Sequence, residues 1–379
     1  MKLLFSLFNY FPHGGQQRNC LLIAQKCAKA GHQVTLCTRT WEGPKPKQIQ
    51  VKTLGCRGWT NAIRNQNFIK DLSIIIAKGY FDGIISFNKM PGLDFYFASD
   101  PCFKAKFQST NKWLGRLTKR YRLYSNWEKA VFEKGQKTQI LLITDREVPL
   151  YQKFYGTEHK RFHLLPPNID KRHFKENDKL KAQNDKREEL GLSTSTSILL
   201  MVGSSYNTKG VDRAIEGLAT LSSKKENPKH LVILGHGKAE KYKRLAHSLN
   251  VLERVHFLGG RSDVPEWMLA ADLLIHPARN ENTGTVLLEA MANGLPLLAS
   301  EVCGYAFHIE KAKAGKIIPS PFSQKQFNRL LQEMVNSPHL SKWSSNGLKY
   351  AATADLYSCH EKAYSLIEKF VTENDYDSL

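Results

Sequence analysis

Short, uninterrupted apolar runs alternate along this chain with stretches of helical periodicity, and this alternation limits the fold more than any other feature. In the first half, the runs that we interpret as strands are residues 2–8, 33–38, 82–87 and 139–144. Between the first two, residues 16–30 are typical of a helix that ends at Gly31. Fully apolar strands separated by helices indicate a parallel sheet with helices on both faces. We therefore expect an α/β fold.

The same alternation starts again after a break at Pro166 and Pro167, which a charged stretch follows. The later strand-like runs are residues 198–202, 231–234, 255–258, 272–276 and 296–299. A chain of 379 residues is also longer than one ordinary hydrophobic core supports. We expect two Rossmann-like domains, 1–168 and 169–354, that face each other across a cleft. A last helix at about 355–379 is expected to pack back on the first domain.

Charge and cysteine content narrow the class of protein. The net charge of +20 favours anionic partners such as nucleic acid, anionic lipid or phosphorylated small molecules. The chain has no zinc-finger spacing and no RNA-recognition motif, which argues against a nucleic-acid-binding protein.

Its seven cysteines are scattered, as expected of reduced thiols in a cytoplasmic protein. No apolar run approaches the roughly 20 residues of a membrane span, so any membrane contact is expected to be peripheral.

Two carboxylates stand out in the stretch 276–300, which reads as a strand, a polar loop, a helix and another strand. Glu289 lies in an otherwise apolar helix, where it could accept hydrogen bonds from the two ribose hydroxyls of a nucleotide. Glu281 lies in the preceding loop and could hold the hydroxyls of a sugar. Gly284 and Thr285, at the helix start, would present backbone amides to a diphosphate.

Glycine-rich turns and cations follow several of the expected strands. Gly14 and Gly15 follow the first strand, and a turn from Gly203 to Lys209 follows the first strand of the second domain. Arg261 follows a third strand. Ligands of open parallel sheets bind at the carboxyl ends of the strands, where these residues would gather. Neither a dinucleotide-binding fingerprint nor a P-loop is present.

These motifs resemble the retaining GT-B glycosyltransferases of the nucleotide-sugar family 4. The resemblance rests on the Glu-x7-Glu run, the Lys-Gly pair after a strand and the first Gly-Gly loop. A closer resemblance, to the lipopolysaccharide core glucosyltransferases, covers nearly the whole chain. It is carried by FPHGGQQR at 11–18, TWEG at 40–43, FNKMPGLDFYFASD at 87–100, LPPNI at 165–169, KGVDRAIE at 209–216 and EVCGYAFHIE at 301–310.

The resemblance implies a reaction and a set of roles. The enzyme would transfer a hexose, glucose from UDP-glucose, onto heptose II of the lipopolysaccharide inner core, with retention and without a cofactor or metal. Another UDP-sugar, such as UDP-GalNAc, another core acceptor and a non-catalytic scaffold remain open. The implied roles are ribose binding by Glu289, sugar binding by Glu281, neutralisation of the diphosphate by Lys209 and Arg261, donor contacts by Gly14, Gly15 and Gly203, and a place near the reaction centre for Asp100.

Two positions depart from the pattern of these enzymes. Thr208 stands where related enzymes often have arginine before the Lys-Gly pair, and Asn19 stands where they carry an acid after the Gln-Arg of the first helix. The first departure bears on phosphate affinity, and the second on the choice of donor or acceptor.

The segment 103–132 carries eight Lys or Arg and a single acid, Glu128. On a helix its aromatic residues fall on one side and its cations on the other, the pattern of an interfacial helix on anionic lipid. The alternative is a surface helix whose aromatics belong to the core. Six residues of this segment are expected to contact the cytoplasmic face of the inner membrane or the acceptor: Lys112, Trp113, Arg116, Lys119, Arg120 and Arg122.

Overall fold

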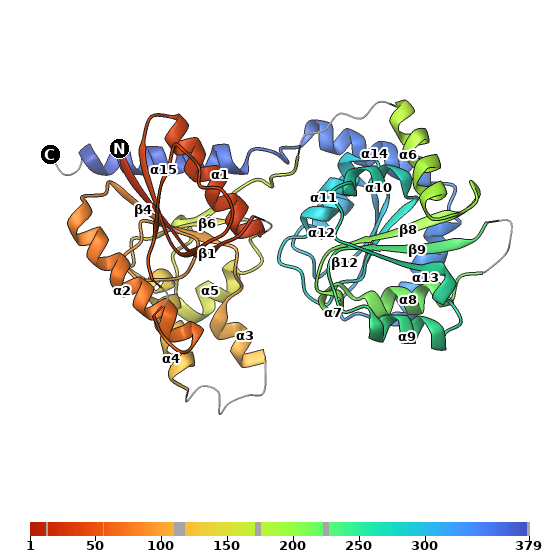
Figure 1. Cartoon of the computed structure of the whole chain (residues 1–379), viewed down its shortest axis with the longest axis horizontal. Coiled ribbons are helices and arrows are strands. Elements are labelled where there is room, and N and C mark those ends of the chain that lie inside the picture. The colour runs from red at the N-terminus through yellow and green to blue at the C-terminus, as the bar shows by residue number, and fades with distance from the viewer. Residues whose placement is uncertain (13, 56, 110–117, 171–175, 223–226, 377–379) are drawn as a thin grey trace. The chain divides into compact units, whose positions relative to one another are not determined.

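A computed structural model describes residues 1–12, 14–55, 57–109, 118–170, 176–222 and 227–376. The chain divides into two compact units (Figure 1). Unit 1 consists of Met1–Pro167 and Ser358–Leu379, and unit 2 of Asn168–Tyr357. Among the described residues, no helix has the length and apolarity needed to cross a membrane.

Unit 1 is built on a seven-stranded sheet in the order β3-β2-β1-β4-β5-β6-β7, in which every neighbouring pair is parallel. Its strands are β1 Lys2–Tyr10, β2 Gln33–Trp41, β3 Gln50–Thr53, β4 Gly83–Ser86, β5 Phe95–Ala98, β6 Gln139–Leu142 and β7 Phe162–Leu164. The order reverses between β1 and β4. The loops after these two strands therefore flank the position where open sheets hold ligands.

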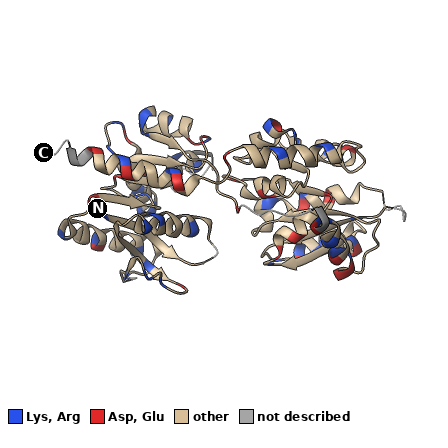
Figure 2. Ribbon diagram, turned by 90° about the horizontal axis from the view of Figure 1, so that it is seen from above, with Lys and Arg blue, Asp and Glu red and all other residues tan. Residues whose placement is uncertain are grey.

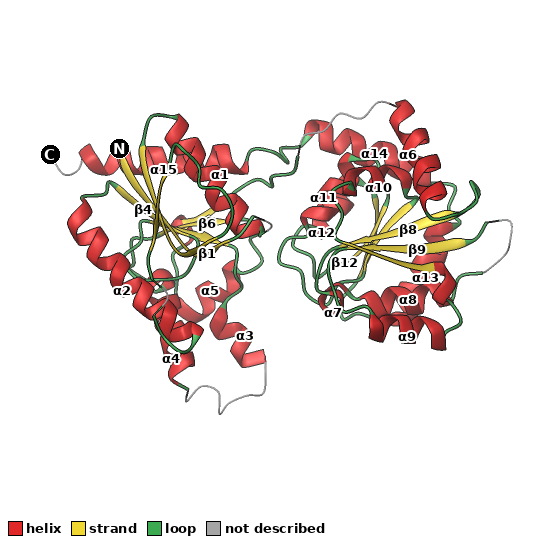
Figure 3. Ribbon diagram, in the orientation of Figure 1, coloured by secondary structure: helices red, strands yellow, loops and turns green. Residues whose placement is uncertain are grey.

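Two apolar cores cover the faces of this sheet, because successive side chains of a strand point to opposite sides. Leu3 and Phe5 belong to one core, and Leu4 belongs to the other. The helices are α1 Gly15–Lys29, α2 Asn61–Gly79, α3 Phe103–Ser109, α4 Lys119–Phe132, α5 Val148–Tyr155 and α15 Cys359–Tyr376, with a 3-10 turn at His159–Arg161. Helices α1 and α15 pack on the first face and α2, α4 and α5 on the second (Figure 3).

Unit 2 repeats the plan with a six-stranded parallel sheet in the order β10-β9-β8-β11-β12-β13. Its strands are β8 Ser197–Val202, β9 Lys229–Leu234, β10 Val255–Gly259, β11 Leu273–His276, β12 Leu297–Ser300 and β13 Gly315–Ile318. Its helices are α6 Glu176–Glu189, α7 Tyr206–Lys209, α8 Val211–Ala219, α9 Glu240–Ser248, η3 Leu252–Arg254, α10 Val264–Ala270, α11 Thr285–Ala292, α12 Ala306–Ala312, α13 Gln324–Val335 and α14 Leu340–Thr353.

The parallel sheets confirm the expected α/β class. In unit 2 the strand order reverses between β8 and β11, so the loops that follow these two strands flank its ligand position. Helices α8, α9 and α13 cover one face of the sheet, and α10, α11, α12 and α14 cover the other. The predicted strand runs recur as β1, β2, β4, β6 and β8–β12, and β5 is the strand that precedes Asp100. Strands β3, β7 and β13 had not been singled out.

Candidate functional site

The loops after β8 and β11 are joined by hydrogen bonds at the carboxyl edge of the unit 2 sheet. The amide of Arg279 donates to the carbonyl of Thr208 at 2.8 Å, and the Arg213 guanidinium donates to the carbonyl of Pro277 at 3.0 Å. Residues more than sixty positions apart are thereby held together. This packing brings Lys209, at the end of α7, next to Glu281 in the β11–α11 loop.

Lys209 and Glu281 form a direct ion pair between Nζ and Oε2. The Nε2 atom of His276, the last residue of β11, lies 3.4 Å from the same carboxylate oxygen. Burial alone would raise the pKa of Glu281. His276 and the Lys209 charge outweigh it and lower the pKa to about 2, so Glu281 is ionised at neutral pH.

His276 is completely buried, and burial lowers its pKa, so the imidazole is neutral at pH 7. His276 therefore acts on the pKa of Glu281 as an uncharged ring and not as a cation. The negative charge of Glu281 is matched by the ammonium of Lys209. The site consequently holds one cation and one anion in contact, with exposed side-chain fractions of 20% and 15%.

Two glycines make this arrangement possible. Gly203 has φ +143°, and a Cβ there would lie 2.7 Å from Cε of Lys209. Any side chain at this position would displace the lysine stem. Gly284 has φ +87° and caps the start of α11, ahead of Thr285. These predicted donor-site positions thus lie beside Lys209 and Glu281.

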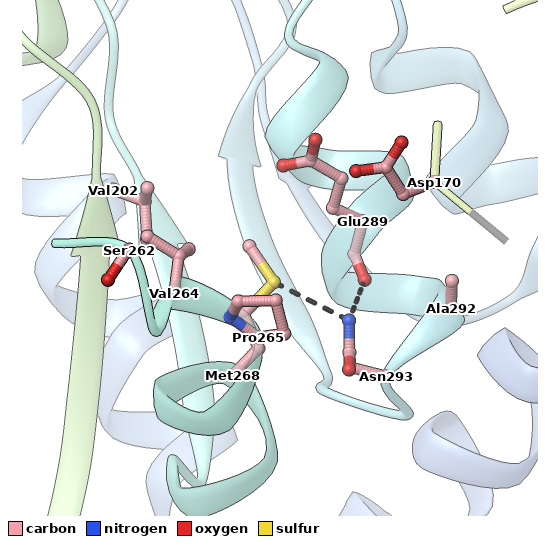
Figure 4. Close-up of a pocket in the computed structure, with 9 residues that line it drawn as sticks. All are labelled: Asp170, Val202, Ser262, Val264, Pro265, Met268, Glu289, Ala292 and Asn293. Carbon is pink, nitrogen blue, oxygen red and sulfur yellow. Dashed lines mark hydrogen bonds between the residues drawn. The ribbon is translucent and has the colours of Figure 1, made fainter. Parts of the chain in front are cut away.

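Glu289 lines a separate part of the same unit, a pocket of about 280 Å³ (Figure 4). The pocket combines two carboxylates with apolar side chains and small polar groups. It is lined by Asp170, Val202, Ser262, Val264, Pro265, Met268, Glu289, Ala292 and Asn293. The side-chain amide of Asn293 donates to the backbone carbonyl of Glu289 at 2.7 Å and to Sδ of Met268 at 3.6 Å, and the second contact ties the end of α11 to α10. Such a lining suits a nucleoside, whose base is largely apolar and whose ribose donates hydrogen bonds.

Arg261 is engaged by carboxylates. Its Nε and Nη2 atoms donate to Asp263 at 2.8 and 2.7 Å, and Nη2 lies 3.0 Å from Glu189. These hydrogen bonds, chiefly those to Asp263, raise the pKa of the guanidinium. Lys186 joins the same cluster through Asp263 at 2.6 Å. The predicted contact of Arg261 with a diphosphate stays a prediction, and it would compete with these ion pairs.

In unit 1, Asp100 follows β5 by two residues, in the loop that leads to α3. The hydroxyl of Tyr151 donates to the carbonyl of Asp100 at 3.2 Å. Gln16, directly after the Gly14–Gly15 turn, donates to Oγ of Ser99 at 2.8 Å and also to the carbonyl of Phe87. The structure therefore places the glycine turn and Asp100 at the same edge of the unit 1 sheet.

The loop around Asp100 is fixed by Glu128, a fully buried residue of α4. Glu128 pairs with Nζ of Lys89 at 2.6 Å and accepts hydrogen bonds from the amides of Phe103 and Lys104 at 2.7 and 3.0 Å, and from the hydroxyl of Tyr155 at 2.6 Å. Burial would raise its pKa, but the lysine charge and these bonds lower it overall. Lys89 also donates to the carbonyl of Pro101 at 2.8 Å.

Three of the residues that build these sites were not singled out in the sequence: Glu128, Lys89 and His276. Glu128 was noted only as the single acid in a basic segment, and that isolation was the available signal. Lys89 stands in the block 87–100 that carries the closer resemblance. His276 ends an apolar strand run, and a histidine in a buried strand is a weak signal of a site.

The described part of the basic segment forms two helices, α3 and α4, where we had treated residues 103–132 as one helical pattern. Lys119, Arg120 and Arg122 are exposed on α4. The predicted surface residues Lys112, Trp113 and Arg116 lie outside the described residues. The ring of Phe103 lies 5.7 Å from Tyr121 and 5.6 Å from Tyr124 between centroids, so aromatic side chains join α3 to α4.

The two departures from the family pattern also have defined surroundings. Oδ1 of Asn19 lies 2.8 Å from Nε2 of His360 in α15, within unit 1. Thr208 lies beside Lys209 in the short helix α7, and its amide donates to the carbonyl of Ser205 at 2.8 Å.

Comparison with known proteins identifies the family. The family model described as "Glycosyl transferases group 1" matches residues 182–350. The chain is 41% identical over 370 residues to the lipopolysaccharide glucosyltransferase WaaG of Escherichia coli (strain K12), covering 97% of this chain and 98% of that protein. A D-inositol 3-phosphate glycosyltransferase of Catenulispora acidiphila is 27% identical, covering 58% of this chain and 56% of its own.

Solved structures agree with this relationship. The crystal structure of WaaG, described as a glycosyltransferase involved in lipopolysaccharide biosynthesis, matches with a TM-score of 0.85 at 41% identity, covering 96% of this chain and 99% of that chain. Anabaena HepE in complex with UDP matches with a TM-score of 0.72 at 16% identity, covering 97% of this chain and 100% of its own, which supports the fold alone. The chain is therefore a glycosyltransferase of family 4 with the GT-B fold, and it belongs to the lipopolysaccharide glucosyltransferase family of WaaG.

Proposed function

We propose that this enzyme transfers glucose from UDP-glucose, with retention of configuration, to heptose II of the lipopolysaccharide inner core. The observation that carries the proposal is the Lys209–Glu281 pair at the carboxyl edge of the unit 2 sheet, in a chain that matches WaaG over nearly its full length. Such a pair offers a cation for a diphosphate and a carboxylate for sugar hydroxyls. The pocket of Glu289, in the same unit, offers a place for the nucleoside.

In this proposal, donor binding separates Lys209 from Glu281 and gives each of them a new partner on the donor. Lys209 leaves Glu281 for the diphosphate, and Glu281 accepts hydrogen bonds from the sugar. Glu289 accepts hydrogen bonds from the ribose, which are charge-assisted and contribute about 1.5–3 kcal/mol each. Gly203, Gly284 and Thr285 present their backbone close to the donor. Gly14 and Gly15 are the residues of unit 1 proposed to contact it.

The chemical step is a front-face displacement. As the bond between the sugar and the diphosphate breaks, negative charge grows on the leaving oxygen and positive charge on the sugar ring. The ammonium of Lys209 and the amino end of α11 stabilise the leaving group, with Arg261 as a second cation, so that no metal is required. The acceptor hydroxyl bonds to the anomeric carbon on the side from which the diphosphate leaves, and it gives its proton to the departing diphosphate oxygen. Asp100 is the unit 1 carboxylate proposed to lie near this reaction centre.

The acceptor is part of a lipid-anchored molecule, which places the enzyme at a membrane surface. We propose peripheral attachment to the cytoplasmic face of the inner membrane through the exposed cations of α4. Unit 1 supports this role by its composition, since 29 of its residues are Lys or Arg and 15 are Asp or Glu. This gives +14 of the total charge of +20, and Figure 2 marks these residues on the ribbon.

A donor panel tests the activity. Purified enzyme is incubated with UDP-glucose, UDP-galactose or UDP-GalNAc and with lipopolysaccharide truncated after the heptoses. Mass spectrometry should detect one added hexose with UDP-glucose, and the NMR coupling constant of the new anomeric proton should show retention. Transfer from UDP-GalNAc alone would replace the donor, and absence of transfer from every UDP-sugar would refute the proposal.

A further inference from the structure

We propose that Trp59 and Ile63, at the amino end of α2, form an apolar anchor that enters the interfacial layer of an anionic bilayer beside the cations of α4. We call these two residues the α2 anchor. This inference extends the proposed attachment to the membrane, because it adds an apolar component and a second structural element to an attachment so far ascribed to charge.

The exposure of the α2 anchor is unusual. Trp59 is 97% exposed and Ile63 is 42% exposed. Tryptophan is a highly buried residue on average, because its large apolar surface is costly to leave in water. A fully exposed tryptophan next to an exposed isoleucine therefore points to a surface that is covered in use.

The loop that carries Trp59 is held in place by hydrogen bonds. Nε of Arg64 donates to the carbonyl of Gly58 at 2.7 Å, and Nδ2 of Asn67 donates to the carbonyl of Arg57 at 2.9 Å. The hydroxyl of Thr60 caps α2 by accepting from the amide of Ile63. Trp59 is thus presented by a fixed backbone, so insertion of its ring orders few additional groups.

The α2 anchor lies at the same end of unit 1 as the cations of α4. Helices between parallel strands run antiparallel to them, so both amino ends lie at the carboxyl edge of the sheet. Nδ2 of Asn65 donates to the hydroxyl of Tyr124 at 3.2 Å, which joins α2 to α4 in their second turns. Figure 1 shows the two helices side by side at this edge.

Charge complementarity identifies an anionic lipid surface as the occupant. Among the described residues, the exposed cations at this end include Arg57, Lys119, Arg120 and Arg122. Asp71, the nearby acid, is paired with Arg57 at 3.1 Å. Tryptophan settles at the boundary between headgroups and acyl chains, and flanking cations hold it against anionic headgroups. A protein partner or a second copy of the chain would not need this combination.

Vesicle flotation of the full-length enzyme tests the inference, using phosphatidylcholine vesicles with and without phosphatidylglycerol. Trp59→Ala should weaken binding to anionic vesicles about tenfold, because the variant loses an aromatic ring that would be half buried in the bilayer. Ile63→Ala should weaken binding less. Ile74→Ala is the matched control, because Ile74 is also an exposed isoleucine of α2, at 53%, and lies three turns further along. Its binding should equal that of the wild type.

The salt dependence of vesicle binding distinguishes the contribution of the α2 anchor from that of the cations. The triple variant Lys119→Gln/Arg120→Gln/Arg122→Gln should lose most of the salt-sensitive binding, whereas the deficit of Trp59→Ala should persist at high salt. If Trp59→Ala binds vesicles as the wild type does while the triple variant loses binding, the α2 anchor is overturned, but the proposed attachment through the cations of α4 is not. Failure of the wild-type enzyme to float would overturn the attachment itself. A wild-type dimer that Trp59→Ala converts to a monomer would assign the surface to self-association and overturn the anchor.

Discussion

The carboxyl edges of the two sheets are built in contrasting ways. In unit 2 a lysine and a glutamate meet in a partly exposed, glycine-lined site, where each is the other's charged partner. In unit 1 the comparable edge is tied down by Glu128, whose carboxylate is fully buried and receives bonds from three elements. One edge can exchange partners and the other is fixed. In the proposed mechanism, the same fold thus provides a donor site that can exchange partners and a rigid support for Asp100.

Breaking the rigid edge should have the largest effect. Lys89→Met leaves the Glu128 charge buried without its cation, which should lower the free energy of unfolding by about 3–5 kcal/mol in urea titrations. Lys129→Met is the matched control, since its pair with Glu133 is exposed and contributes about 0–1 kcal/mol. The double variant Lys89→Met/Glu128→Gln should recover part of the loss. Equal losses for Lys89→Met and the control would contradict a buried support.

Breaking the responsive edge should reduce turnover and leave the fold intact. Glu281→Gln removes the charged partner of Lys209 and the carboxylate proposed to receive the sugar, so kcat at saturating UDP-glucose should fall about 100-fold. The midpoint of urea unfolding should stay near the wild-type value. Glu310→Gln, an exposed acid on α12, serves as the control. Wild-type turnover by Glu281→Gln would remove this residue from the reaction.

Glu289 should influence binding more than turnover. Glu289→Ala removes the acceptor proposed for the ribose hydrogen bonds, so KM for UDP-glucose should rise roughly 10- to 100-fold. Calorimetry with UDP alone should show a matching loss of affinity, because the ribose is present in both ligands. An unchanged affinity for UDP would place the nucleoside outside this pocket.

Arg261 should give the smallest change among these residues. Its guanidinium is already held by Asp263 and Glu189, so Arg261→Gln is expected to raise KM for the donor only about threefold, close to the contribution of an exposed ion pair. Lys209→Gln provides the comparison and should have a much larger effect on kcat/KM. Equal losses in the two variants would show that Arg261 contributes as much to the diphosphate as Lys209 does.

Much of the fold could be predicted from the sequence, because long apolar runs identify strands that are buried on both faces. Length does not set the missed strands apart, because β4 and β6 also have four residues; what can be lacking is a continuous apolar run. For example, β3 reads Gln-Val-Lys-Thr and has one apolar residue, so its pairing with β2 depends on the sheet and not on its own pattern. Lys209 and Glu281 were both predicted as site residues from local context. Their contact was not predicted, because it depends on how two loops pack.

The features that escaped prediction involve partners far apart in the chain. Glu128 and Lys89 are 39 residues apart, and a lone acid in a basic segment reads as a surface charge until its burial is known. Arg261 is a partial exception, because its main partner, Asp263, is two residues away and only Glu189 of α6 comes from far along the chain. Local patterns indicate which residues are unusual, while the fold decides which of them meet.

The contact between Lys209 and Glu281 also bears on which ligands the proposed donor site would accept. A simple anion such as inorganic phosphate can satisfy the lysine, but it leaves the largely buried glutamate without its charged partner. A neutral sugar can satisfy the glutamate, but it leaves the lysine without an anion. Only a molecule that joins an anion to a hydroxyl-bearing ring replaces both halves of the pair at once. In the proposed mechanism, the empty site therefore rejects abundant small solutes through the cost of separating its own charges.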